Sequence, residues 1–209
     1  MEEDNKPWAI QRKLQSKRRP EKQYVIDRAV YAAGGSPRDA CLVSLTYLTG
    51  GRISEIVNIK TGDIKEEEIK MKDGTPIKHL VIEMPNKKNR KRKFKTIPLS
   101  YVRDKALIDC AIPWIEYRRT QLGLEQTNKT PQEWEEMDTR LFRFTPIRGY
   151  QIIREITNMN PHFLRHLRLT ECALTGMHLP NLQKMAGWTD LKPAQSYMEL
   201  NYYDIAQDW

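Results

Sequence analysis

The segment Leu48–Ile56 reads Leu-Thr-Gly-Gly-Arg-Ile-Ser-Glu-Ile, and its two glycines separate two apolar stretches of helical periodicity. The helix before the glycines is predicted to begin at Ser36-Pro37, because serine caps a helix and proline suits its first turn. Arg52 therefore lies among apolar neighbours, where a guanidinium is costly unless it is paired. Glu55, one turn later, is predicted to hold Arg52, and this pair alone fits a structural role as well as a functional one.

The rest of the chain predicts an α+β fold that is mostly helical and carries a small three-stranded antiparallel sheet. Residues 1–20 are polar and basic and are predicted to form a tail or linker, whereas residues 21–209 form one domain. Strands are expected at residues 63–71 with an interruption, at 77–84 and at 94–99. Helices are expected at residues 21–33, 36–49, 53–59, 102–122, 146–157, 160–175, 180–186 and 193–207.

Charge points to a polyanionic partner. The formal net charge is +8 and the sequence pI is about 9.3, which favours nucleic acid. Seven of the nine residues from 87 to 95 are basic. These are Lys87, Lys88, Arg90, Lys91, Arg92, Lys93 and Lys95.

Other features narrow the class of protein. No apolar run approaches the ~18–20 residues that span a bilayer, and the acidic start Met1–Asp4 lacks a secretory apolar region. We therefore expect a soluble, intracellular protein. The three cysteines are far apart in sequence, which disfavours a disulfide framework or zinc finger and favours buried thiols.

Three further motifs carry residues suited to phosphate chemistry. His162-Phe163-Leu164-Arg165-His166 follows the capping pair Asn160-Pro161, and His162 and Arg165 share a helix face. The spacing of His162 and His166 resembles a metal-binding pair, but Phe163 stands where a zinc protease needs glutamate, so no metal is expected. Gly187-Trp188 and then Tyr197 follow, each of which alone would be an ordinary helix stop or packing residue.

In combination, these motifs resemble the catalytic domain of the tyrosine recombinases, the phage-type integrases. That family carries Thr-Gly-x-Arg-x-x-Glu, then His-x-x-Arg-His, then Gly-His or Gly-Trp, and then a tyrosine nine residues on. Here Trp188 precedes Tyr197 by nine residues and follows Arg165 by twenty-three, as in the family. The resemblance covers about residues 21–205. Trp188 departs from the commoner histidine, although its indole N–H can still donate to a phosphate oxygen.

The resemblance implies cleavage and rejoining of DNA through a covalent 3′-phosphotyrosine, with neither metal nor cofactor. Arg52 and Arg165 would clamp the non-bridging phosphate oxygens. Tyr197 would attack, with His162 as the acceptor of its proton, because a phenol with a pKa near ~10 is a weak nucleophile. The implied partner is double-stranded DNA, on which protomers self-associate as dimers or tetramers, in the cytoplasm at the nucleoid or in the host of a virus or mobile element.

The family also places a lysine in the β-hairpin to protonate the leaving 5′-oxygen. Counting from the first strand selects Lys87, with Lys88 as the alternative, whereas counting back from Pro98 selects Arg90. We prefer Lys87, because the strand before the turn is clear. The other basic residues of the hairpin are predicted to grip DNA phosphates. They are Lys88, Arg90, Lys91, Arg92 and Lys93.

Several alternatives stay open at this stage. A type IB topoisomerase shares this set of residue types, and a DNA-binding module that has lost catalysis would share the fold. A general RNA-binding domain is disfavoured, since no aromatic-rich strand motif is present. Only a short segment precedes residue 21, so the chain is expected to be either shortened or a minimal recombinase without the usual N-terminal clamp domain. Integration, excision and dimer resolution are not distinguished.

Overall fold

The computed structural model describes residues 22–71, 73–86, 94–127, 137–195 and 197. The predicted tail, the hairpin tip, residues 128–136 and the last twelve residues lie outside this part. The helices are α2 (Lys22–Ala33), α3 (Pro37–Thr49), α4 (Ile53–Ile56), α5 (Lys105–Thr127), α7 (Pro146–Thr157), α8 (Pro161–Leu174) and α9 (Leu179–Ala186). The strands are β1 (Ile64–Lys70), β2 (Pro76–Pro85) and β3 (Phe94–Ser100), and a 3₁₀ turn, η2 (Thr61–Asp63), precedes β1.

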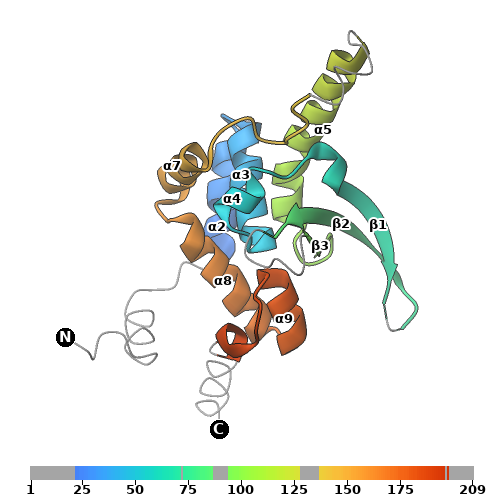
Figure 1. Ribbon diagram of the computed structural model, residues 1–209, viewed down its shortest axis with the longest axis vertical. Helices are drawn as coiled ribbons and strands as arrows, with labels where there is room; N and C mark the ends of the chain where they lie inside the picture. The colour runs from blue at the N-terminus through green and yellow to red at the C-terminus, as the bar shows by residue number, and fades with distance from the viewer. Residues whose placement is uncertain (1–21, 72, 87–93, 128–136, 196, 198–209) are drawn as a thin grey trace, which may run out of the picture.

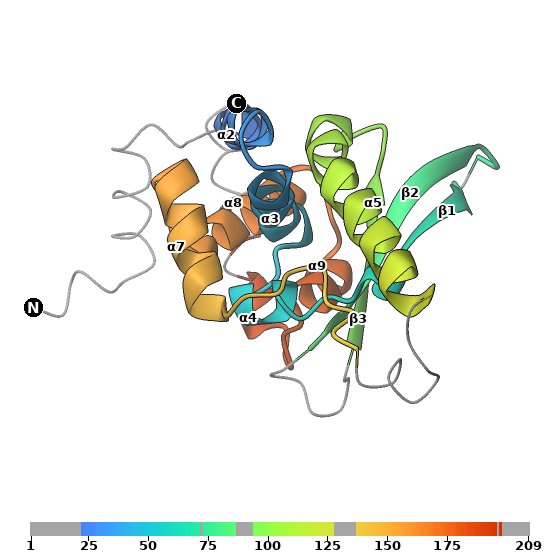
Figure 2. The same cartoon turned by 90° about the horizontal axis from the view of Figure 1, so that it is seen from above.

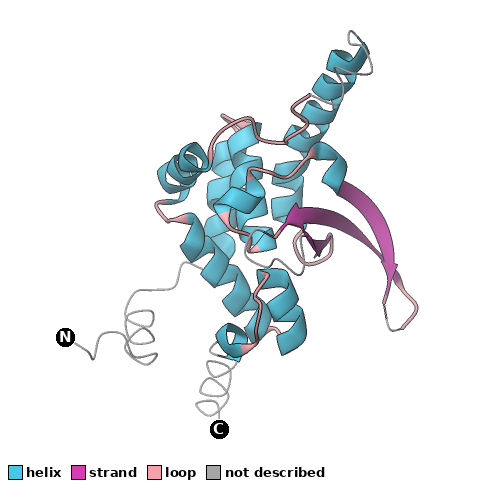
Figure 3. Ribbon diagram, viewed as in Figure 1, coloured by secondary structure: helices cyan, strands magenta, loops and turns pink. Residues whose placement is uncertain are grey.

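The predicted fold class is confirmed. The three strands form one antiparallel sheet in the order β1-β2-β3, set beside a group of helices (Figures 1 and 3). Strands β1 and β2 extend away from the helices as a curved ribbon (Figure 3). β1 is continuous from Ile64 to Lys70, without the predicted interruption, because each of its residues pairs with β2.

Helix boundaries follow local capping chemistry. The side chain of Ser36 accepts a hydrogen bond from the Asp39 amide at the start of α3, as predicted from the Ser-Pro pair. Asn160 caps α8 in the same way. Helix α3 ends at Gly50, whose φ of 56° is the left-handed conformation that glycine adopts without strain. Helix α4 is shorter than predicted and ends at Ile56 rather than at residue 59.

Helix α3 forms the centre of the molecule. All of its residues from Ala40 to Thr49 are buried, and it packs against α2, α5, α7 and α8. Figure 2 shows α3 between α2, α5 and α7 when the molecule is seen from above. The glycine break at residues 50 and 51 therefore follows directly on a helix whose last ten residues are buried.

A buried ion network joins α8 to the start of α5. Arg168 donates to both carboxylate oxygens of Asp104, at 3.0 and 2.8 Å, and to Glu171 at 2.6 Å. Lys22 of α2 reaches the same two carboxylates, at 3.0 and 3.1 Å. Burial alone would raise the pKa of Asp104, but the hydrogen bonds and charge of Arg168 hold it below its ordinary value. This network fixes the position of α8, which carries several of the predicted site residues.

Within the described ranges, no helix combines the length and the apolar character that crossing a bilayer would require.

Candidate active site

The double-glycine break places Arg52 at the N-terminus of α4. A Cβ atom at Gly51 would lie 2.6 Å from the terminal methyl group of Met84 and 2.8 Å from that of Ile56, so the backbone passes close to β2 and a larger residue would have to displace these side chains. Arg52 emerges from this passage only partly buried. Its Nη1 atom donates to Glu55 Oε1 at 2.9 Å, and its backbone amide donates to Glu55 Oε2 at 3.1 Å.

Glu55 also holds a second cation, Lys95, which the sequence analysis counted in the basic run 87–95 but to which it assigned no role. The Nζ atom of Lys95 lies 3.1 Å from Glu55 Oε2 and donates to the Met185 carbonyl oxygen at 3.2 Å. Both side chains are almost completely buried. The strand pattern could have revealed this lysine, because Lys95 alternates in register with Ile97 and Leu99, which face the core.

Burial lowers the pKa of Lys95 to about 8, although the charge of Glu55 opposes the shift; the charges of Arg165 and Arg52 lower it further. The unfolded chain would keep this proton up to the ordinary pKa of 10.5. Between these values the unfolded state binds more protons than the folded state, so unfolding takes up a proton and stability rises with pH.

The free energy of unfolding of the wild type should therefore rise between pH 8 and 10.5. Lys95→Met, which has no titratable group at this position, should lack this rise. The check is urea unfolding of the wild type and Lys95→Met at several pH values across this window. We expect the wild type to gain stability relative to the variant as pH rises. A constant difference between the two proteins would contradict the assigned titration.

Arg165 lies in the interior and ties three elements together. Its Nη1 atom donates to the Gly50 carbonyl oxygen at 2.6 Å and its Nη2 atom to the Ala186 carbonyl oxygen at 2.7 Å. Its guanidinium also lies 5.8 Å from the centre of the Trp188 ring. Burial, followed by the like charge of Arg52, lowers the pKa of Arg165 to about 10. The two arginines are therefore close enough to repel, an arrangement that an anion between them would relieve.

Tyr197 packs over Trp188 and reaches α8. The ring centres of Trp188 and Tyr197 are 5.7 Å apart, and the phenol is largely buried. Burial raises the pKa of Tyr197 to about 12, with the charge of Arg165 opposing. Its hydroxyl group forms a hydrogen bond with Nδ1 of His166. Sequence reasoning had paired Tyr197 with His162; the ring of His162 instead lies perpendicular to that of His166, at 4.6 Å.

The predicted hairpin cations lie outside the described residues. This applies to Lys87, the preferred lysine, to its alternative Lys88, and to the basic residues 90–93. The preceding residue is informative, because the buried side chain of Asn86 lies so close to Gly187 that a Cβ there would be 3.0 Å from Asn86 Oδ1. Asn86, the last described residue before the hairpin tip, therefore lies beside Gly187, the neighbour of Trp188.

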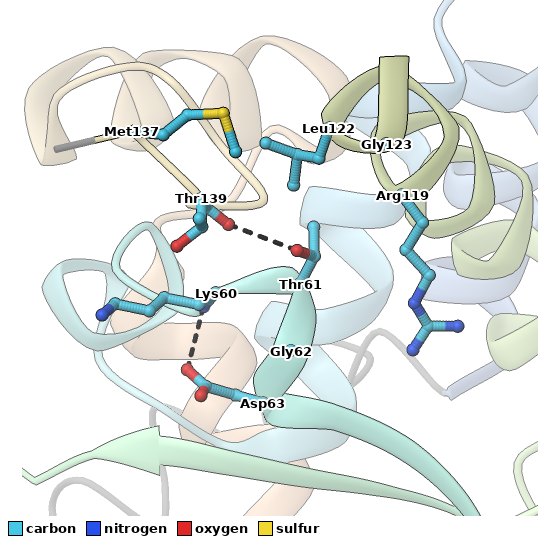
Figure 4. A pocket seen from close by; sticks show the side chains of 9 residues that line it. All are labelled: Lys60, Thr61, Gly62, Asp63, Arg119, Leu122, Gly123, Met137 and Thr139. Carbon is cyan, nitrogen blue, oxygen red and sulfur yellow. Dashed lines mark hydrogen bonds between the residues drawn. The ribbon is translucent and has the colours of Figure 1, made fainter. Parts of the chain in front are cut away.

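One depression among the described residues lies away from these side chains. It encloses about 390 Å³ between η2, the second half of α5 and residues 137–139 (Figure 4). Arg119 lines it, but its guanidinium already donates to the Ile64 carbonyl oxygen at 2.5 Å. None of the predicted site residues lines this depression, so it is not the site that the motifs form. In the described part, no group of three or more histidine, cysteine, aspartate or glutamate side chains could hold a metal ion.

Comparisons with known proteins bear on the family of the chain. Residues 23–203 match the model of the phage integrase family. Tyrosine recombinase XerC of Corynebacterium efficiens is 25% identical over 164 residues, which cover 78% of this chain and 47% of that protein. The type 1 fimbriae regulatory protein FimE of Escherichia coli K12 is 26% identical over 197 residues, 90% of this chain and 87% of FimE. The chain thus spans about half the length of XerC and most of the length of FimE.

Solved structures share the fold. The crystal structure of XerA recombinase superposes with a TM-score of 0.58 at 19% identity, covering 88% of this chain and 61% of that one. The XerH site-specific recombinase, bound to a palindromic difH substrate in a post-cleavage complex, gives 0.58 at 15% identity, covering 90% and 51%. At these identities the likeness establishes the fold alone. Because the family model spans residues 23–203, the chain belongs to the phage integrase family.

Proposed function

We propose that this chain is a site-specific recombinase that cleaves and rejoins double-stranded DNA through a 3′-phosphotyrosine at Tyr197. One observation carries the proposal: Tyr197 packs on Trp188, which in turn packs on the buried Arg165. A nucleophile, an N–H donor and a fixed positive charge therefore meet at one place. Hydrolysis by water would need no side-chain nucleophile there, whereas covalent capture of a phosphate needs one, and the Tyr197 hydroxyl group can serve.

The two arginines are suited to the phosphate. Arg52 is partly exposed and anchored by Glu55, and Arg165 is held by two backbone carbonyls, so both guanidiniums are oriented before DNA arrives. Oriented donors that meet developing charge need no reorganisation during the reaction, which is the main source of electrostatic catalysis. We assign both arginines to the non-bridging oxygens of the attacked phosphate, and Trp188 to one further hydrogen bond.

The leaving 5′-oxygen requires a proton donor, and we assign it to Lys87, with Lys88 as the alternative. The position of Asn86 beside Gly187 supports this role, because it starts the hairpin tip next to Trp188. The remaining hairpin cations are assigned to the DNA backbone, and the net charge of +8 supports an electrostatic grip of this kind. We further propose that protomers associate on DNA and that the protein acts in the cytoplasm.

Nicked duplexes of random sequence, incubated with the protein in a chelator-containing buffer, should yield a covalent protein–DNA band on a denaturing gel. A nick beside the attacked phosphate lets the leaving fragment diffuse away and traps the adduct. Tyr197→Phe should abolish the band, since it removes only the attacking oxygen. Tyr150→Phe, which alters an exposed tyrosine on α7, should leave the band unchanged.

The outcome separates the related functions. DNA binding without an adduct across the whole random pool would favour an inactive DNA-binding module. An adduct that survives Tyr197→Phe would place the nucleophile elsewhere. Relaxation of a supercoiled plasmid without exchange between two copies of the captured sequence would favour a topoisomerase.

A further inference from the structure

We propose that the side-chain amide of Asn86 is a further phosphate ligand of the site, and that its Nδ2 atom donates a hydrogen bond to an oxygen of the attacked DNA phosphate. This assignment rests on the proposed function and deepens it, because it adds a neutral donor to the two arginines and Trp188. No role was expected for Asn86 from the sequence alone.

The pattern of burial along β2 turns Asn86 inward. Leu80, Ile82 and Met84 are completely buried, whereas Glu83 is exposed. Successive side chains of a strand point to opposite faces, so the inward face takes every second residue. Asn86 lies two residues beyond Met84 and is only 5% exposed, so it continues the inward face past the end of the strand.

Two glycines show where this inward face arrives. A Cβ atom at Gly51 would lie 2.6 Å from the terminal methyl group of Met84. A Cβ atom at Gly187 would lie 3.0 Å from Oδ1 and 3.1 Å from Nδ2 of Asn86. Gly51 directly precedes the first of the two site arginines, and Gly187 directly precedes the tryptophan. The end of β2 therefore contacts both of the segments that carry these proposed phosphate ligands.

The site beside Asn86 carries an excess of positive charge. Arg52, Lys95 and Arg165 are close enough to influence one another, and they lie around the carboxylate of Glu55. The register of the sheet places Lys95 opposite the residue two positions before Asn86. Arg165 donates to the carbonyl oxygen that directly precedes the glycine beside Asn86, at 2.7 Å. An anion would balance this charge, and it would be drawn to the wall of the site that Asn86 forms.

The amide of Asn86 lacks the partners that a buried polar group needs. Within the described part of the chain, neither its Oδ1 nor its Nδ2 atom has a hydrogen-bond partner, and both atoms are buried. Such a group destabilises the fold, and native proteins contain few of them. A phosphate oxygen would supply the missing acceptor in a charge-assisted hydrogen bond.

The amide can meet the phosphate without rebuilding the site. Its oxygen and nitrogen ends are nearly equal in size, so rotation about the Cβ–Cγ bond can turn the N–H group toward an anion. Asn86 is also about as enclosed as Arg165, which is 3% exposed. A phosphate that reaches this arginine therefore enters the same enclosed part of the molecule as the amide.

Two substitutions of nearly unchanged size separate phosphate binding from packing. Asn86→Leu removes both the donor and the unpaired polar atoms, whereas Asn86→Asp replaces the donor with an oxygen that repels phosphate. If Asn86 only packed, the aspartate would be tolerated, because it has the same shape and lies beside cations. Asn181→Asp, which adds the same charge at an exposed position of α9, is the matched control. Circular dichroism melting curves would establish that all three variants are folded.

The first measurement is the first-order rate of adduct formation with a nicked duplex. We expect Asn86→Leu to lower the rate by about 10- to 100-fold, as when a hydrogen bond to a charged group is lost. Asn86→Asp should lower it further, and Asn181→Asp should stay within about threefold of the wild type. In urea, Asn86→Leu should be at least as stable as the wild type, because it buries no unpaired amide. A rate within about threefold of the wild type for either Asn86 variant would overturn the proposal.

A second measurement needs neither DNA nor catalysis and so separates this proposal from the proposed function. In ¹⁵N-labelled protein, the side-chain amide signal of Asn86 is identified by its absence from Asn86→Leu. We expect this signal to shift when dimethyl phosphate is added, and not when sodium chloride is added to equal ionic strength. An unchanged signal would overturn the phosphate contact, even if the wild type forms an adduct. The expected shift in a protein that forms no adduct would support the contact and count against the recombinase function.

Discussion

Replacing Glu55 with glutamine is expected to lower the free energy of unfolding by about 3–5 kcal/mol and to remove measurable adduct formation. Glu55 is completely buried, and its carboxylate lies between Arg52 and Lys95. Burial alone would raise the pKa of Glu55, but the charge of Lys95 and the hydrogen bonds from Arg52 hold it below its ordinary value. The neutral amide would leave the ammonium of Lys95 buried beside two guanidiniums without a counter-charge.

Urea unfolding of Glu55→Gln, Lys95→Met and the double variant would test this expectation. Lys95→Met alone should cost less, because Glu55 keeps its bond to Arg52. The double variant should be more stable than Glu55→Gln, since it no longer buries an uncompensated lysine. Glu67→Gln, which changes an exposed glutamate of β1, should stay within about 0.5 kcal/mol of the wild type. Additive losses in the double variant would show that Glu55 and Lys95 do not interact.

Arg165→Lys is expected to reduce the rate of adduct formation by about 100- to 1,000-fold, comparable to the loss of one oriented donor in other active sites. A guanidinium can bond the carbonyls of Gly50 and Ala186 and still present an N–H edge to phosphate. The ammonium group of a lysine, on its flexible side chain, cannot donate to both carbonyl oxygens and to a phosphate oxygen with the fixed geometry of a guanidinium. The variant keeps the positive charge, so the loss reports geometry rather than charge.

Arg168→Lys provides the matched control, because Arg168 is equally buried and lies one turn further along α8. Its partners are Asp104 and Glu171, not the reaction site. We expect this control to lose stability in urea while its adduct rate, measured at a temperature where it is folded, stays within a few-fold of the wild type. Equal kinetic losses in both variants would indicate that the effect of Arg165→Lys is general loosening of α8.

The sequence predicted local features well and contacts between distant segments poorly. Ser36, Asn160 and Gly50 fix helix ends through their own caps and dihedral angles, so their signals are local and readable. The predicted fold class and family are confirmed for this reason, since the motifs sit at such boundaries. The roles assigned to individual site residues stay predictions, although Arg52, Arg165, Trp188 and Tyr197 do come together.

The sequence analysis did not predict the contact of His166 with Tyr197 or the burial of Lys95, and both omissions have a physical cause. His162 and His166 both share a face of α8 with Arg165, so helical spacing cannot tell which ring meets Tyr197 from another segment. Lys95 ends a run of exposed-looking cations, and only its alternation with Ile97 marks it as inward. The choice between Lys87 and Lys88 depends on how the longer hairpin turn is accommodated, and no local rule fixes that register.

The last turn of α9 has a consequence for cooperativity. Lys95 donates to the carbonyl oxygen of Met185, and Arg165 to that of Ala186, so two cations of the site occupy the negative end of this short helix. If α9 frays, both cations lose a partner and Arg165 loses its orientation. By thermodynamic linkage, an anion that binds the oriented Arg165 must equally favour the closed helix. If Arg165 binds a DNA phosphate, as the proposed function requires, amide hydrogen exchange in α9 should therefore slow when DNA is bound.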